Sequence, residues 1–134
     1  ITIFRQVLRQ ITPVLRDTFD IELVEKHHRM KLDAPSGTAK MLLAALEDGR
    51  EYKKIYGREG MGKRGAEIGV HSVRGGTIAG EHTVLFAGDD EILEITHRAG
   101  SNQIFAAGAV LAAQFAAGRK PGLYDMNDVL FHRI

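Results

Sequence analysis

The chain has 134 residues, of which 44% are hydrophobic and 26% charged, and its 18 basic and 17 acidic side chains leave a net charge of +1. This composition is typical of a globular protein and excludes a disordered or fibrous chain. The length suits a single domain over 1–134, because one domain takes roughly 100–200 residues. The near-neutral charge gives no reason to expect nucleic acid or an anionic membrane as a partner.

Two further absences narrow the class of protein. The sequence contains no Cys, so disulfides, thiolate metal sites and cysteine nucleophiles are excluded. It also lacks both the run of ~20 apolar residues that a membrane span needs and the charged and apolar regions of a signal peptide. We therefore expect a cytoplasmic protein.

The first third of the chain alternates helix and strand patterns. Residues 1–15 carry apolar side chains at the spacing of an amphipathic helix, already at full strength at Ile1, which suggests that the chain starts inside an element. Pro13 predicts either a kink or a second short helix capped by Thr12. A strand is expected over 19–24 and a helix from Thr38 to the glycine at position 49.

The remainder predicts a loop, three strands and a second long helix. Glycines and basic residues mix over 50–66, which indicates a loop. Closely spaced turn signals then favour consecutive antiparallel strands at 67–74, 77–87 and 91–98. An alanine-rich helix over 101–117, containing Phe105 and Phe115, is expected to pack in the core, and the tail shows no clear element.

This order predicts an α+β fold, with an open, mixed, largely antiparallel sheet and helices packed on one face. The other face of such a sheet would be left open to solvent. We expect another subunit to cover it, through the apolar side chains of Val84, Phe86, Ile92 and Leu93.

The segment from Glu25 to Thr38, EKHHRMKLDAPSGT, is the densest group of chemically active side chains. It places two imidazoles and several cations just before a predicted helix N-terminus, where unpaired N–H groups and the helix dipole favour anions. Histidine titrates near neutral pH and can move protons, while lysine supplies a positive charge or an acid. The segment therefore predicts an anion at the helix start with His and Lys beside it. The alternative is that Ser36 or Thr38 only caps the helix and the histidines are surface residues.

Three other sequence patterns are weaker indications of function than this segment. The G-x-G-x-x-G of residues 60–65 is preceded by a basic loop and followed by a strand pattern, the wrong context for a dinucleotide fingerprint. The chain has six histidines that form no zinc motif, so no metal is expected: His27, His28, His71, His82, His97 and His132. Of these, His71, His82 and His97 lie on predicted strands and are assigned to sheet faces or interfaces. An anion- or RNA-binding role for the 50–64 loop is disfavoured because acidic residues dilute its basic ones.

The segment EKHHRMKLDAPSGTA closely resembles the signature of dihydrodipicolinate reductase (4-hydroxy-tetrahydrodipicolinate reductase) of lysine and diaminopimelate biosynthesis. The resemblance continues through GVHSVRGGTIAGEHTVLFAG and EILEITHRAGSNQIFAAGAVLAA to GLYDMNDVL, which covers nearly the whole chain in order. It implies an oxidoreductase that passes hydride from NADPH or NADH to a cyclic dicarboxylate. It also implies that this chain is the C-terminal substrate-binding and tetramerisation domain, without the N-terminal Rossmann cofactor domain.

The same resemblance assigns roles by motif position. His27 resembles the catalytic acid/base histidine and Lys31 the catalytic lysine. Residues that would contact the substrate and its carboxylate are His28, Ser36, Gly37 and Thr38.

The resemblance also implies partners. The expected ones are a small dicarboxylate and, through the open sheet face, three further copies of the chain in a homotetramer. No strong binding of NADPH or NADH is expected for this domain alone. The alternative is an isolated tetramerisation module without activity.

Overall fold

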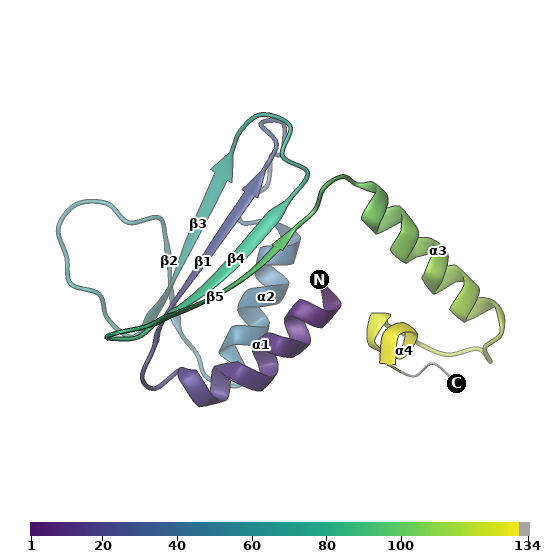
Figure 1. Cartoon of the computed structure of the whole chain (residues 1–134), viewed down its shortest axis with the longest axis horizontal. Coiled ribbons are helices and arrows are strands. Elements are labelled where there is room, and N and C mark those ends of the chain that lie inside the picture. The colour runs from purple at the N-terminus through teal and green to yellow at the C-terminus, as the bar shows by residue number, and fades with distance from the viewer. Residues whose placement is uncertain (132–134) are drawn as a thin grey trace.

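The computed structural model describes residues 1–131; the predictions that involve His132 and the last residues lie outside this range. This part of the chain forms four helices and five strands, and Figure 1 shows how they are arranged. The helices are α1 (Thr2–Leu15), α2 (Gly37–Glu47), α3 (Gln103–Ala117) and α4 (Met126–Phe131). The strands are β1 (Asp20–His27), β2 (Lys53–Tyr56), β3 (Glu67–Arg74), β4 (Glu81–Ala87) and β5 (Ile92–Arg98).

The strands form one open mixed sheet in the order β2-β3-β1-β4-β5, which confirms the predicted α+β class. The β2–β3 and β1–β3 pairs are parallel, whereas the β1–β4 and β4–β5 pairs are antiparallel. The expectation that 67–74, 77–87 and 91–98 are neighbours in sequence order was wrong for the first two. β1 lies between β3 and β4, because the glycine turn after β3 leads over the end of β1 rather than into a hairpin.

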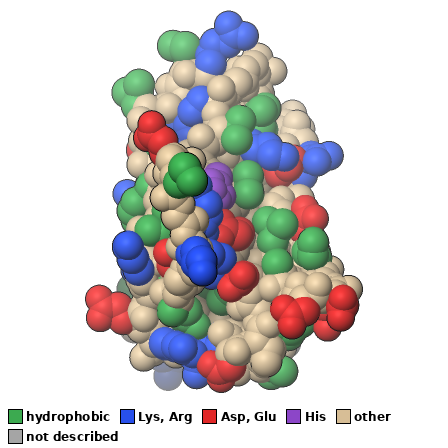
Figure 2. Space-filling model, turned by 90° about the vertical axis from the view of Figure 1, so that its left-hand side faces the viewer, with side chains coloured by type: hydrophobic (Ala, Val, Ile, Leu, Met, Phe, Trp, Pro, Cys, Tyr) green, Lys and Arg blue, Asp and Glu red, His purple; other side chains and the backbone are tan. Residues whose placement is uncertain are grey.

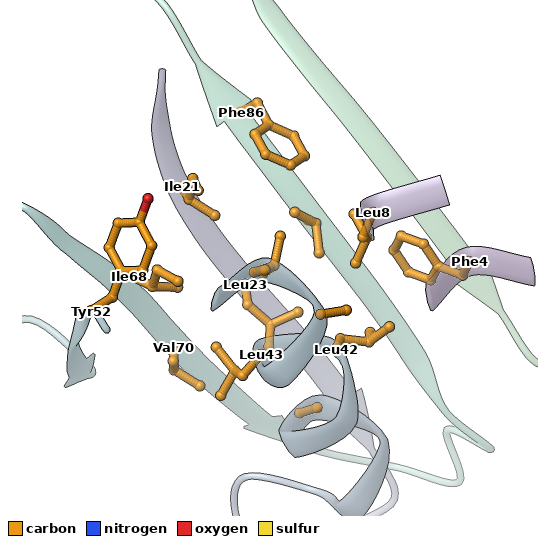
Figure 3. Close-up of a cluster of buried hydrophobic side chains, with 14 residues drawn as sticks. Phe4, Leu8, Ile21, Leu23, Leu42, Leu43, Tyr52, Ile68, Val70 and Phe86 are labelled. Carbon is orange, nitrogen blue, oxygen red and sulfur yellow. The ribbon is translucent and has the colours of Figure 1, made fainter. Parts of the chain in front are cut away.

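Helices α1 and α2 cover one face of the sheet, and the core lies between them and the strands (Figures 1 and 3). α1 runs through Pro13 as a single helix, so the predicted second helix capped by Thr12 does not form. α2 begins after Ser36 and ends at Glu47; Asp48, which follows it, is in the left-handed conformation, and Gly49 also has a positive φ. The buried side chains of both helices meet Ile21, Leu23, Ile68, Val70, Val84 and Phe86 of the sheet.

The opposite sheet face carries charged and apolar side chains together. By strand register Val24, Leu85 and Ile92 lie on it, so the expectation holds for Ile92, whereas Leu93 pairs with Phe86 on the helix-covered face. Val84 and Phe86 are fully buried beneath the helices, so the assignment of these two residues to the open face was wrong. Side chains alternate along a strand, and the residues on the open face include Glu22 of β1 and His71 of β3, which form an ion pair. Figure 2 shows the side of the molecule at the left of Figure 1, where basic and acidic side chains are intermixed.

Helix α3 leaves the body of the domain and lies away from the sheet (Figure 1). None of its residues is buried, so the expectation that this alanine-rich helix packs in the core was wrong. Its exposed apolar side chains include Ile104, Phe105 and Val110. Among the described residues, no helix combines the length and the apolar character needed to cross a bilayer.

Replacing Leu23 by alanine is expected to destabilise the domain by about 2–5 kcal/mol, because this side chain is fully buried between α2 and the neighbouring strands. Urea denaturation followed by far-ultraviolet circular dichroism measures the change. Leu123→Ala is the matched control, since Leu123 is fully exposed, and it should leave the free energy of unfolding within about 0.5 kcal/mol of wild type. Equal effects of the two substitutions would contradict the placement of the core.

Candidate active site

Strand β1 brings the first part of the 25–38 segment into the sheet. The strand continues to His27, beyond the predicted end at position 24, and its alternate residues Ile21, Leu23, Glu25 and His27 are buried on the helix-covered face. The first two of these side chains belong to the apolar core, whereas the last two, near the carboxyl end of β1, are a carboxylate and an imidazole on the same face. The polar segment then turns through 28–36 and enters α2.

A cavity of about 230 Å³ lies at this end of the sheet. Four predicted site residues line it: His27, His28, Lys31 and Thr38. β4 and β5 supply His82 and His97, and the approach to β4 supplies Gly80. Residues that lie far apart in the sequence, such as His27 and His97, thus meet around one small polar cavity.

His27 contacts a buried ion pair formed by Glu25 and Arg74. Its Nδ1 forms a short contact with a carboxylate oxygen of Glu25, a side chain with an exposed fraction of 0%. Arg74 of β3 donates to both oxygens of that carboxylate, at 2.9 and 2.7 Å. Burial would raise the pKa of Glu25, but the hydrogen bonds, chiefly from Arg74, outweigh it and lower the pKa to about 2. Glu25 is therefore ionised at neutral pH.

A second buried contact joins β4 to the start of α2. Ser36 Oγ accepts the backbone N–H of Ala39 at 3.1 Å, which caps the helix, and lies 3.0 Å from His82 Nε2. The rings of His82 and His27 meet edge to face, with centroids 5.1 Å apart. Burial lowers the pKa of His82 to about 4, with a smaller contribution from His27, so this ring is neutral at pH 7.

Lys31 and α2 supply positive potential to the cavity. The Lys31 ammonium lies 2.7 Å from a carboxylate oxygen of Asp33, and this partner lowers the pKa of Asp33. Thr38, in the first turn of α2, lines the cavity, whereas Ser36 lies beneath it and Gly37 is exposed at the helix start. The arrangement can hold an anion beside imidazole side chains and the Lys31 ammonium.

Within residues 1–131, the atoms of Glu25, His27 and His82 lie close enough to hold a metal ion. The Glu25 carboxylate, however, already accepts two hydrogen bonds from the Arg74 guanidinium. A cation placed there would face that guanidinium at close range. The three residues are better described as a hydrogen-bonded support for the site than as a metal centre.

The sequence predictions gave no role to three of these groups. Glu25 could have been found from alternation, because it lies two positions before His27 and so shares its face. His82 was assigned to a sheet face or interface, but the sheet places it against His27. No sequence signal pairs Arg74 with Glu25, because the parallel β1–β3 pairing that brings them together spans 49 positions.

Ser36→Ala is expected to destabilise the domain by about 1 kcal/mol through loss of the helix cap, and by a further ~1–3 kcal/mol because His82 loses its hydrogen-bond partner. His82 Nδ1 has no partner either, so both ring nitrogens would be unpaired. Thermal unfolding followed by circular dichroism tests this. Ser36→Thr keeps the hydroxyl and should retain most of the stability; equal losses in both variants would contradict the assigned role.

Comparison with known proteins identifies related chains. Residues 1–130 match the family model described as dihydrodipicolinate reductase, C-terminus. The 4-hydroxy-tetrahydrodipicolinate reductase of Methanoregula boonei is 53% identical over 131 residues, covering 97% of this chain and 51% of the relative. The enzyme of the same name from Brachyspira hyodysenteriae is 50% identical over 133 residues, covering 97% of this chain and 57% of the relative. The chain thus spans about half the length of these curated relatives.

A solved structure supports the same relationship. The dipicolinate-bound dihydrodipicolinate reductase from Paenisporosarcina sp. TG-14 superposes with a TM-score of 0.67 at 26% identity. The match covers 96% of this chain and 51% of that one.

Proposed function

The chain belongs to the family of dihydrodipicolinate reductase C-terminal domains, and from this premise we propose that it forms the substrate-binding and catalytic half of a 4-hydroxy-tetrahydrodipicolinate reductase. The observation that carries the proposal is the cavity that joins His27, His28, Lys31 and Thr38 at the start of α2. The enzyme would reduce its cyclic dicarboxylate with NADPH or NADH in lysine and diaminopimelate biosynthesis, in the cytoplasm.

The proposed mechanism gives each group in the cavity a separate task. Lys31 attracts a carboxylate to the N-terminal end of α2, where the backbone N–H groups of Gly37 and Thr38 and the Thr38 hydroxyl can donate hydrogen bonds. His28 contacts the ring from the side of the loop. His27 exchanges a proton with the substrate once hydride has arrived, and Lys31 balances the negative charge.

The cofactor is assigned to the half of the longer relatives that this chain does not match. We propose a Rossmann domain there, and we expect no strong binding of NADPH or NADH to this chain alone. The unburied apolar face of α3 supports this division, because further polypeptide could cover it.

A homotetramer assembled through the open sheet face is the proposed state of the chain. That face combines the Lys26–Glu81 and Arg98–Glu81 ion pairs with the exposed apolar side chains of Val73 and Ile92, so the proposed interface would be both polar and apolar. Light scattering should report a mass four times that of one chain, and a monomer at micromolar concentration would contradict the proposed assembly.

The location of the binding site is tested by titrating the ¹⁵N-labelled chain with pyridine-2,6-dicarboxylate in an amide NMR experiment. We expect shift changes at Lys31, Gly37, Thr38 and Gly80, with Glu22 and Glu94 on the open face unchanged. Changes confined to the open face or the 57–66 loop would contradict the proposed site. The alternative of a tetramerisation module without a ligand predicts no shift changes at all.

A further inference from the structure

Glu25 occupies a position that apolar packing alone would give to a hydrophobic residue. It follows Ile21 and Leu23 on the buried face of β1, and its exposed fraction is 0%. Burying a carboxylate is costly unless it is paired and hydrogen-bonded. The buried carboxylate is adjacent to His27, the residue assigned to proton exchange. This position indicates that Glu25 has a role other than packing.

The partners of Glu25 determine where the protons lie. Arg74 donates to both carboxylate oxygens, and the backbone N–H of Ser36 donates to Oε1 at 3.3 Å. A guanidinium and a backbone N–H can only donate, and an ionised carboxylate can only accept. The contact between Glu25 Oε2 and His27 Nδ1 therefore requires the proton to be on Nδ1.

We propose that Glu25, held by Arg74, is a positioning residue that fixes His27 in the Nδ1-protonated tautomer, so that Nε2 is the nitrogen that gains and loses the catalytic proton. The inference rests on the proposed function for the role of that proton. In the neutral ring, Nε2 has a free lone pair; in the imidazolium it carries the proton that can be donated. Glu25 touches neither substrate nor cofactor in this scheme.

The surroundings of Nε2 agree with this assignment. Gly80 and His27 both line the cavity, and a Cβ built on Gly80 would lie 3.2 Å from Nε2, so any larger residue there would press on that nitrogen. The edge-to-face contact with His82 limits rotation of the ring. Since burial lowers the pKa of His82 to about 4, this second ring stays neutral while His27 gains or loses its proton.

Glu25→Gln tests the polarity of the hydrogen bond without changing the shape of the side chain. Two donors, Arg74 Nη2 and the Ser36 N–H, converge on Oε1, whereas Oε2 accepts one hydrogen bond from Arg74 Nη1, so the Gln carbonyl oxygen should take the Oε1 place and the Nη1 bond is lost. The amide NH₂ then replaces Oε2 and faces His27. The imidazole is the partner that can change from donor to acceptor, so we expect the ring to switch to the Nε2-protonated tautomer.

The experiment is a long-range ¹H–¹⁵N correlation spectrum of the imidazoles in the labelled chain at pH 8, where a histidine is mainly neutral. We expect wild type to show Nδ1 protonated and Nε2 unprotonated, and Glu25→Gln to reverse the two. Glu22→Gln is the matched control: it removes a carboxylate of the same strand that contacts His71 and Arg58 on the opposite face. This control should leave the His27 tautomer unchanged.

Glu25→Ala provides a second variant if the glutamine variant does not fold, and it should give a mixture of both tautomers. An Nε2-protonated ring in wild type, or an unchanged His27 tautomer in a folded Glu25 variant, would overturn the inference. Titration of the same samples with pyridine-2,6-dicarboxylate separates the two proposals. Absence of binding to wild type would count against the proposed function, whereas the tautomer decides the role of Glu25.

Discussion

Replacing Lys31 by alanine is expected to weaken the binding of pyridine-2,6-dicarboxylate by ~10- to 100-fold, which corresponds to the loss of one charge-assisted hydrogen bond of about 1.5–3 kcal/mol. The Lys31 ammonium lies at the cavity beside the N-terminal end of α2. Isothermal titration calorimetry measures the change. Lys40→Ala removes an equal charge from an exposed position of the same helix and should leave the affinity within about twofold.

The opposite change in affinity is expected when Asp33 is neutralised. Its carboxylate lies 2.7 Å from the Lys31 ammonium and competes with the ligand for this ammonium group. Asp33→Asn removes that competing charge and should tighten binding. If Lys31→Ala bound the dicarboxylate as tightly as wild type, or if Asp33→Asn bound it more weakly, Lys31 would not be the carboxylate-binding cation.

Replacing Glu25 by alanine is expected to lower the free energy of unfolding at pH 7 by about 3–5 kcal/mol, because it leaves the partly buried Arg74 guanidinium without its carboxylate. Guanidinium chloride denaturation measures this. Glu22→Ala removes partly exposed contacts with Arg58, Arg64 and His71 and should cost less, about 1 kcal/mol. Equal costs for both variants would contradict the burial of the Glu25 pair.

The same variant has a defined pH dependence. The folded-state pKa of Glu25 is lowered from 4.5 to about 2, so the unfolded chain binds more protons than the folded chain between these values. The stability from Glu25 is therefore present above pH 4.5 and is lost as the pH falls towards 2. The difference between wild type and Glu25→Ala should shrink over this interval. A difference that stays constant from pH 7 to pH 2 would contradict the assigned ionisation.

Local patterns were sufficient to predict most elements of this fold. The 3.6-residue spacing of 1–15, the glycine after α2 and the paired turn signals around β4 and β5 each act over a few residues. β2 was missed because its four residues, Lys53–Tyr56, are mostly polar and lie within a segment rich in glycine and lysine. The end of β1 was missed because polar residues replace apolar ones where the strand enters the site.

Strand order could not be predicted from local patterns. The turn residues that favour a hairpin between β3 and β4 also permit β1 to lie between these two strands. That pairing is what brings His82 to His27 and Arg74 to Glu25. The motif therefore predicted four of the residues that line the cavity, but not the lining residues from β4 and β5 or the buried Glu25–Arg74 pair. The apolar sequence of α3 predicted burial, yet its contacts in the described chain, such as that of Phe115 with Tyr124, leave none of its residues buried.

The central claim is that the cavity at the start of α2 binds a dicarboxylate. Calorimetric titration of wild type with pyridine-2,6-dicarboxylate and with pyridine-2-carboxylate, at equal ionic strength, tests it most directly. We predict one site per chain for the dicarboxylate and binding at least tenfold weaker for the monocarboxylate, because one charged contact is lost. Equal affinities for the two compounds, or no heat of binding for the dicarboxylate with a folded chain, would contradict the claim.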